Sequence, residues 1–316
     1  MNSHIRELIL TSTGAQTAFH IEIVQRLWSG YGDIVRYGLT GGDRSTVIVK
    51  HVKLRSSGRG VSHQRKVRSY QVETAWYSQW SGRCDAYCRV PACLAFESFG
   101  DEVFIVLEDL DTAGFPKRRS FVGDDEMHAC LKWLANFHAT FIGEHPKGLW
   151  STGTYWHLAT RPDELQALND PVLKNAASLI DQKLRNSSYQ TFVHGDAKLA
   201  NFCFSDDGKH VAAVDFQYVG GGCGIKDVAY FIDSCLDGDQ AERQLNQLLD
   251  VYFLALKQAL KTKQKAVDAD DVERDWRALY PVAWTDFHRF LKGWGPGYWP
   301  TNSYSERLAR QVIAQL

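Results

Sequence analysis

The chain has 316 residues, of which 44% are hydrophobic and 23% charged, and its formal net charge is −1. A dedicated nucleic-acid-binding protein would carry a basic excess, so this balance argues against that class. No run of about 18 apolar residues is present, and Met1–His20 lacks the pattern of a secretory signal, so the sequence predicts a cytoplasmic protein without a membrane span. Seven cysteines with no second cysteine or histidine pair to complete a zinc set predict reduced thiols.

The first third of the chain has the pattern of antiparallel strands. Alternating and β-branched runs over 21–24, 34–39 and 46–50 are separated by Gly-rich turns, which predicts two successive hairpins. Apolar runs from Pro91 to Phe96 and over 102–107 predict two further strands.

Between these strands lies a polar and basic stretch, Ser56–Arg68, which we expect to be an exposed loop. A helix should follow it, because five large or acidic side chains recur there at helical spacing on one face: Tyr70, Glu73, Trp76, Tyr77 and Trp80.

The rest of the chain has mostly helical periodicity. Helices are expected from about Asp124 through Phe141, over 162–185, over 239–260, and from Trp276 onward. A sheet-rich first third followed by a helix-rich remainder predicts an α+β protein with two lobes, an antiparallel-sheet N-lobe and a mostly helical C-lobe.

The segment 192–217 carries the strongest chemical signal. Asp207-Gly208 between two apolar runs is typical of a hairpin turn, and a turn centred on Gly208 would place Asn201 opposite Asp215. Asp196 precedes this hairpin in a loop. Two carboxylates and an amide oxygen would then converge, and Mg²⁺ prefers such ligands together with water and phosphate oxygens. The alternative is that Asp196 and Asn201 cap a loop and Asp215 ends a strand.

Lys50 ends the β-branched run Val47-Ile48-Val49. Glu73 shares a helix face with aromatic residues, where an ionised carboxylate needs a partner because burying it alone costs several kcal/mol. Lys50 on the adjacent sheet is the natural partner, and such a pair positions a lysine on nucleotide phosphates. The alternative is an exposed Lys50 and a half-exposed Glu73.

Taken together, these motifs resemble the aminoglycoside- and choline-kinase-type small-molecule phosphotransferases of the protein-kinase-like fold, and most of all their ecdysteroid-kinase-like branch. The resemblance runs from about Leu27 to Phe231 and is weaker in the last third. The motifs that carry it are Val-Ile-Val-Lys ending at Lys50, Glu73, 106–110, Phe137-His138-Ala139, His194-Gly195-Asp196 with Asn201, and Asp215-Phe216-Gln217.

The resemblance implies a role for each matching residue. Asp196 would be the catalytic base, Asn201 and Asp215 would hold Mg²⁺, and Lys50, steadied by Glu73, would bind ATP phosphates. The backbone of Glu108, Asp109 and Leu110 would be a hinge that reads adenine. That hinge would separate an N-terminal nucleotide-binding lobe, 1–107, from a C-terminal catalytic and acceptor-binding lobe, 111–316. Asp227 would brace the catalytic loop, and His194 would support it.

The sequence departs from the protein-kinase pattern in its phosphate loop, which reads Ser29-Gly30-Tyr31-Gly32-Asp33. We expect Ser29, Gly30 and Gly32 to contact phosphate. Lys198 is expected at the γ-phosphate. The glycine-rich stretch 220–224 replaces a long activation segment and is expected to be a mobile loop near the acceptor.

The sequence therefore predicts an ATP- and Mg²⁺-dependent kinase acting on a hydroxyl group of a small metabolite, with a nucleotide-binding pseudokinase as the alternative. A protein kinase is disfavoured because the Ala-Pro-Glu signature is missing. Aromatic clusters at 150–157 and 284–299 favour a flat, apolar or small cationic acceptor, whereas Arg289, Lys292 and Arg307 would suit an anionic one. We expect no nucleic-acid or membrane partner, and a monomer or homodimer.

Overall fold

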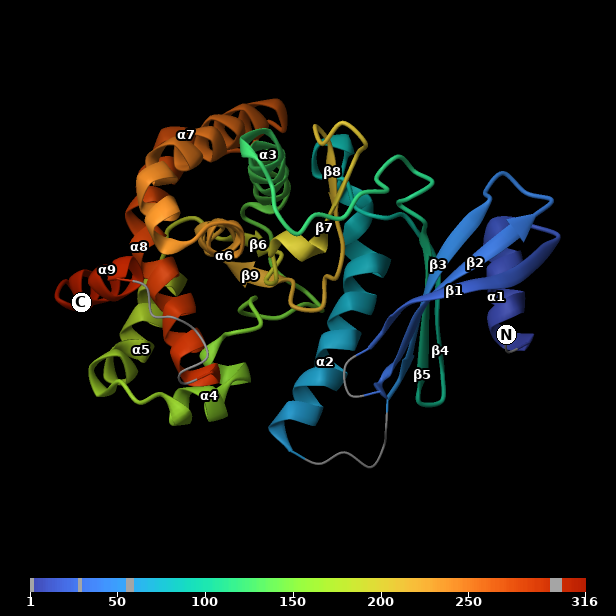
Figure 1. Cartoon of the computed structure of the whole chain (residues 1–316), viewed down its shortest axis with the longest axis horizontal. Helices are drawn as coiled ribbons and strands as arrows, with labels where there is room; N and C mark the ends of the chain where they lie inside the picture. Colours follow the sequence, from blue (N-terminus) through green and yellow to red (C-terminus); the bar gives the residue numbers. More distant parts are fainter. Residues whose placement is uncertain (1–2, 28–29, 55–59, 296–302) are drawn as a thin grey trace.

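The computed structural model describes residues 3–27, 30–54, 60–295 and 303–316, and it has two lobes (Figure 1). The strands are β1 (Thr17–Arg26), β2 (Gly32–Thr40), β3 (Thr46–Lys53), β4 (Cys93–Phe99), β5 (Glu102–Glu108), β6 (Thr191–Val193), β7 (Phe202–Phe204), β8 (Val211–Ala213) and β9 (Gly220–Gly222). The α-helices are α1 (Ser3–Thr13), α2 (Val61–Ala75), α3 (Asp124–Phe141), α4 (Pro162–Ala167), α5 (Pro171–Arg185), α6 (Ile225–Cys235), α7 (Gly238–Thr262), α8 (Ala269–Trp294) and α9 (Ser303–Ile313). The predicted α+β bilobal fold is confirmed. No helix in these ranges is long and apolar enough to span a membrane.

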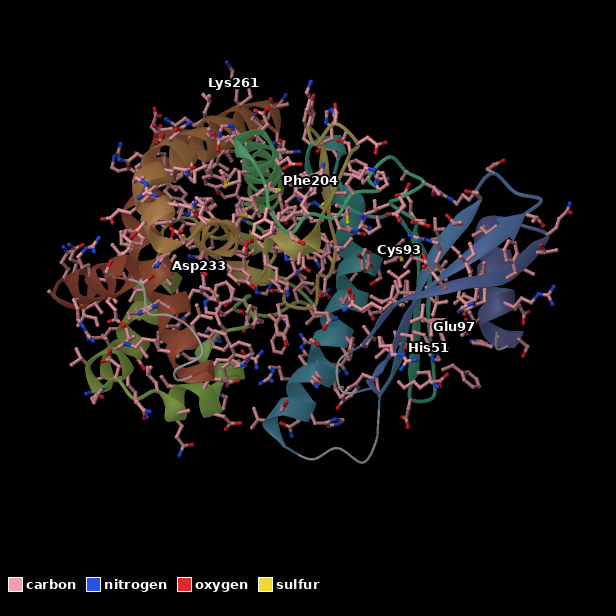
Figure 2. The ribbon with its side chains drawn as sticks, in the orientation of Figure 1. His51, Cys93, Glu97, Phe204, Asp233 and Lys261 are labelled. Carbon is pink, nitrogen blue, oxygen red and sulfur yellow. The ribbon has the colours of Figure 1, made fainter. Side chains whose placement is uncertain are left out.

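The first lobe is a five-stranded antiparallel sheet in the order β1-β2-β3-β5-β4. One face packs under α1, which the sequence reasoning did not foresee, and buries a small core. His51, whose ring centroid lies 4.4 Å from that of Phe104, and Glu97, which lies 3.3 Å from His4 of α1, mark this side of the sheet in Figure 2. The opposite face carries Lys50 and looks toward the second lobe.

Of the stretch Ser56–Arg68, expected to be an exposed loop, residues 56–59 lie outside the described residues, and the part from Val61 onward is helical because it belongs to α2. Contacts with the second lobe fix this polar part of the helix. Arg65 donates to the carbonyl of Thr160 at 2.8 Å, and Arg68 donates to the carbonyl of Leu149 at 2.9 Å. The helix then widens into a π-helical turn over Trp76–Trp80. Such turns are rare and occur often at functional sites.

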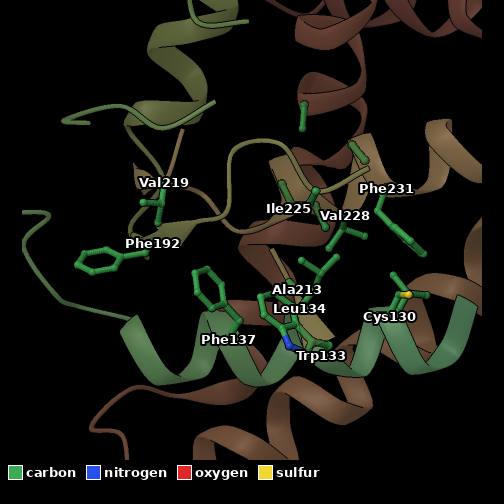
Figure 3. Close-up of a cluster of buried hydrophobic side chains, with 14 of the residues drawn as sticks. Cys130, Trp133, Leu134, Phe137, Phe192, Ala213, Val219, Ile225, Val228 and Phe231 are labelled. Atoms are coloured by element: carbon green, nitrogen blue, oxygen red, sulfur yellow. The ribbon is translucent and has the colours of Figure 1, made fainter. Parts of the chain in front are cut away.

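In the second lobe α3 packs against α7 and α6, and α8 packs against α6 and α7 (Figure 1). Its core draws together segments that are far apart in the sequence, as Figure 3 shows for Trp133 and Phe137 of α3, Phe192 of β6 and Phe231 of α6. The expected helix over 162–185 is two helices, since Pro171 opens α5 and Asp170 caps it by accepting from the amide of Leu173.

Two local expectations about the second lobe were wrong. The β7–β8 ladder pairs Phe202 with Ala213, so Asn201 lies opposite Val214 rather than Asp215, one residue out of the predicted register. The glycines at 220–222 form β9, which pairs with β6 instead of making a mobile loop. A Cβ on Gly220 would lie 2.3 Å from the carbonyl oxygen of Trp150, so close packing explains the glycine there.

Candidate active site

Lys50 and Glu73 form the expected ion pair, on the face of the sheet that meets Asp215 of the second lobe. The two side chains are 4% and 2% exposed, and Lys50 Nζ lies 2.6 Å from Glu73 Oε2 and 3.4 Å from Asp215 Oδ1. Burial raises the pKa of Glu73 to about 7, despite the attraction of Lys50. Burial also disfavours the ammonium form of Lys50, but the two carboxylates more than offset this and raise its pKa.

Glu73 also links the sheet lobe to the Asp215 segment. Its carboxylate accepts a hydrogen bond from the backbone amide of Phe216. One turn further along, the Trp76 ring stacks on the Phe216 ring, with centroids 4.5 Å apart and an interplanar angle of 16°. The π-helical turn starts at Trp76, so it sets this stack in place. Lys50 and Asp215 are therefore positioned by the same short stretch of chain.

Asp196 lies in the loop after β6 and is almost fully buried. Its Oδ2 accepts from Asn201 Nδ2 at 3.0 Å and from Lys198 Nζ at 3.1 Å, and its Oδ1 accepts from Tyr230 Oη at 3.1 Å. Burial raises the pKa of Asp196 above its ordinary value; Lys198 opposes the shift, and the charge of Asp215 adds to it. A fixed, poorly solvated carboxylate of this kind suits a proton acceptor.

Asp227 fixes the backbone of the loop that carries Asp196. Its fully buried carboxylate accepts from the amide of His194 at 2.5 Å and from the amide of Gly195 at 3.0 Å. It also lies 3.1 Å from Nε2 of His138, in the Phe-His-Ala motif of α3. Gly195 has φ +79°, and a Cβ there would lie 2.1 Å from the carbonyl oxygen of Tyr218. The loop therefore needs glycine at this position.

Asn201 and Asp215 offer oxygens suited to a hard cation. The amide nitrogen of Asn201 donates to the backbone carbonyl and to Oδ2 of Asp196, and no hydrogen bond among the described residues uses Asn201 Oδ1. Asp215 is 38% exposed and has φ +67°, a conformation that side chains rarely adopt and that is often found at functional sites. No three His, Cys, Asp or Glu side chains gather as a metal set in the described parts of the chain. One carboxylate and one amide oxygen nevertheless fit Mg²⁺, which keeps several waters and phosphate oxygens.

The expected hinge, 108–110, starts at the last residue of β5. The side chain of Glu108 binds Arg89, and that of Asp109 accepts from Arg36 Nε and Thr46 Oγ1, each at 2.8 Å. Within the described ranges, no hydrogen bond uses the amide of Leu110, so this donor remains available to a ligand.

Apolar side chains of the sheet share the face that carries Lys50, next to the segment 108–110. Ile34 and Ile105 lie directly opposite Lys50 on the neighbouring strands, so they share its face. Ile48 lies two residues earlier on β3, on the same face and nearer the hinge. A flat ring could therefore stack beneath the sheet with its edge toward Leu110.

The phosphate loop is described only in part. Ser29 lies outside the described residues. Gly30 and Gly32 have φ +70° and +134°, and a Cβ on Gly32 would lie 1.9 Å from the carbonyl oxygen of His51. Gly32 thus has a backbone reason to be glycine. A contact of either glycine with phosphate stays a prediction.

The aromatic clusters are mainly core. Trp156, Phe287 and Phe290 pack together and are buried. Tyr155, beside them, is partly exposed, whereas Tyr298 and Trp299 lie outside the described residues. The cations named for an anionic acceptor are all paired with carboxylates: Arg289 with Asp286, Lys292 with Asp170 and Glu306, and Arg307 with Glu242.

Sequence reasoning missed two polar residues of α6. Tyr230 binds Asp196 and also Tyr155. Asp233, one turn later, lies among the helices of the second lobe (Figure 2), and burial raises its pKa to about 7. The signal was helical spacing from Asp227, because residues three and four apart share a face.

Comparisons with known proteins show the family and the fold. The model of the Ecdysteroid kinase-like family matches residues 37–142 and 151–265. The solved amicoumacin kinase hAmiN, in complex with AMP-PNP, Ca²⁺ and Ami, superposes with a TM-score of 0.56 at 14% identity, over 100% of this chain and 94% of that one. A Plasmodium vivax ethanolamine kinase gives 0.51 at 9% identity, over 94% and 84%. At such identities these structures show the fold alone. No curated protein matches the sequence.

Proposed function

This chain belongs to the ecdysteroid kinase-like family, and we propose that it is a kinase that transfers the γ-phosphate of ATP to a hydroxyl group of a small metabolite. The observation that carries the proposal is that Lys50 Nζ lies 2.6 Å from Glu73 Oε2 and 3.4 Å from Asp215 Oδ1, and that the charge of Asp215 reaches the buried Asp196. We propose residues 1–107 as the nucleotide-binding lobe, 108–110 as the hinge and 111–316 as the catalytic and acceptor-binding lobe.

On this proposal the nucleotide lies between the two lobes of the protein. The amide of Leu110 would bind the adenine edge under the apolar face of the sheet, and Gly30 and Gly32 would let the backbone approach the phosphates. Lys50, held by Glu73, would bind phosphate oxygens. Asn201 and Asp215 would hold Mg²⁺, which neutralises phosphate charge when bound.

Asp196 would accept the proton of the acceptor hydroxyl. Tyr230 and Asn201 fix the two oxygens of this carboxylate, so its position does not depend on the acceptor. Phosphoryl transfer needs orientation and charge neutralisation more than a strong base, so a positioned carboxylate is sufficient. Lys198, 41% exposed and bound to Asp196, would reach toward the γ-phosphate.

The pseudokinase alternative requires that a catalytic group be lost or displaced. Lys50, Asp196, Asn201 and Asp215 are all present, and each has contacts that fit its proposed role. Transfer of label from γ-labelled ATP to a mixed pool of small alcohols tests the proposal. Labelled small molecules should form with the wild type and should not form with Asp196→Asn. Mg-ATP binding without transfer to any pool member would favour the nucleotide-binding regulator.

A further inference from the structure

Three cations from the two lobes lie close enough to affect one another's charge; we call Arg65, Lys66 and Arg161 the cationic cluster. Arg65 and Lys66 lie on α2 of the first lobe, and Arg161 precedes α4 of the second. Arg65 Nη1 donates to the carbonyl of Thr160 at 2.8 Å, which places it beside Arg161. Lys66 Nζ lies 5.1 Å from the ring centroid of Tyr31, in the phosphate loop.

Arg161 is held rigidly. Its Nε donates to the carbonyl of Tyr155 at 2.8 Å, and its Nη1 donates to Glu164 at 2.9 Å. The guanidinium also lies 5.5 Å from the ring centroids of Tyr155 and Phe290. With a side chain only 15% exposed, Arg161 is a preorganised charge rather than a mobile surface residue.

Hydrogen bonds connect the surroundings of the cationic cluster with the loop that carries Asp196. The amide of Tyr155 donates to the carbonyl of Gly195 at 3.0 Å, so the residue that anchors Arg161 touches the residue before Asp196. On the other side, Arg65 hydrogen-bonds the side chain of Tyr218, whose carbonyl accepts from the amide of Thr154 at 3.2 Å. An acceptor whose hydroxyl reaches Asp196 would therefore extend past Tyr155 and Tyr218 toward the cluster.

Acids in the described parts of the chain balance the two arginines of the cluster only in part. Burial lowers the pKa of Lys66, and the charges of Arg65 and Arg161 lower it further. Within the described ranges, Arg161 has one carboxylate partner, Glu164, and Arg65 has none. The Nε of Arg65 is buried without a hydrogen-bond partner. A ligand anion would complete this arrangement.

We propose that the cationic cluster binds an anionic group, a phosphate or a carboxylate, carried by the acceptor, so that the substrate is a hydroxylated metabolite with a negative charge. This inference rests on the proposed kinase function, because it locates the acceptor from Asp196. It differs from both acceptors considered from the sequence, which were a flat, apolar or small cationic acceptor and an anionic acceptor bound by Arg289, Lys292 and Arg307. The γ-phosphate of the nucleotide is the other anionic group that would fit the cationic cluster.

Inorganic phosphate is the probe for the first test. The full chain is saturated with Mg-AMP-PNP, whose terminal phosphate occupies the nucleotide position, and then titrated with phosphate by calorimetry. We expect the wild type to bind phosphate and Arg65→Gln and Arg161→Gln to bind it about tenfold more weakly or worse. Arg68→Gln is the matched control. This variant removes the same charge from the same helix, but Arg68 donates to the carbonyls of Gly148 and Leu149 instead.

The titration distinguishes a site for an anion of the acceptor from a site for the phosphates of the nucleotide. If phosphate binds only without nucleotide, the cluster serves the nucleotide phosphates, and the acceptor proposal is wrong. Equal loss in Arg68→Gln would show a general effect of helix charge and would also overturn it. Failure of the wild type to bind Mg-AMP-PNP would count against the kinase function, and the same titration without nucleotide would still show whether Arg65 and Arg161 bind an anion.

A label-transfer assay with a panel of anionic, neutral and cationic alcohols provides the second test. Label should enter anionic members, and Arg65→Gln and Arg161→Gln should raise the acceptor KM about tenfold with the KM for ATP little changed. Label confined to neutral or cationic members would contradict the proposal.

Discussion

Tyr230 donates a hydrogen bond of 3.1 Å to Oδ1 of Asp196, the oxygen that Asn201 and Lys198 leave open. Tyr230 lies on α6 three residues after Asp227, which braces the backbone of the same loop. One helix therefore fixes both the backbone and the side chain of the proposed base.

Replacing Tyr230 with Phe should lower kcat about tenfold while leaving Mg-ATP binding intact, because a hydrogen bond to a charged group contributes roughly 1.5–3 kcal/mol. Steady-state kinetics and nucleotide titration measure the two effects. Tyr280→Phe is the matched control, since Tyr280 is also buried but its hydroxyl has no hydrogen-bond partner within the described ranges. A loss of kcat as large in Tyr280→Phe would mean that Tyr230 acts only through packing.

The pH profile should show the raised pKa of Asp196. A base must be ionised, so kcat/KM should fall as the pH drops through this pKa, at a higher pH than an ordinary Asp would give. Lys198 lowers the pKa of Asp196, so Lys198→Met should move the acid limb to higher pH. Acid limbs that coincide in the wild type and the variant would show that Lys198 does not tune this carboxylate.

Lys50→Met should abolish phosphate positioning and also change stability in a pH-dependent way. Glu73 has a pKa of about 7 in the folded protein against 4.5 ordinarily, because burial favours its neutral form. The contribution of this neutral form to the stability of the fold is therefore lost as the pH rises through the folded-state pKa of Glu73. Without Lys50 the variant should lose more stability at pH 8 than at pH 6, up to about 3–5 kcal/mol. Thermal unfolding of both proteins at the two pH values measures this. Equal losses at both pH values would contradict the assigned ion pair.

Asp215→Asn should remove metal-dependent turnover without unfolding the protein. Asparagine tolerates the left-handed backbone found at Asp215, with φ +67°, so the local fold should persist. Turnover at saturating Mg²⁺ should fall at least about 100-fold, because the proposed metal ligand is lost. Circular dichroism checks the fold and a Mg²⁺ titration checks the activity. Retained turnover with an unchanged Mg²⁺ dependence would place the metal elsewhere.

Much of the fold and several site residues could be predicted because their signals are local. The β-branched run ending at Lys50, the aromatic face around Glu73 and the Asp-Gly turn each lie within a few residues. The expected Lys50–Glu73 pair is present because an acid buried on an aromatic face needs a cation. The hairpin is present as well, although its register differs by one residue from a turn centred on Gly208.

Other features depend on long-range contacts that no local pattern carries. The start of α2 reads as a polar loop, yet Arg65 and Arg68 tie it to backbone carbonyls 80 or more residues away. The glycines of β9 resemble a flexible loop, but they allow Trp150 to approach. The cationic cluster likewise combines residues 95 positions apart, so only the folded chain shows it.

The most direct test of the central claim compares the wild type with Asp196→Asn in one assay, following label from γ-labelled ATP with Mg²⁺ into pooled small alcohols. Nucleotide binding is measured in parallel on the same samples. The account predicts a labelled small molecule with the wild type, none with Asp196→Asn, and comparable Mg-ATP binding by both. Full transfer by Asp196→Asn would contradict it, because Asp196 would then not be the group that receives the acceptor proton.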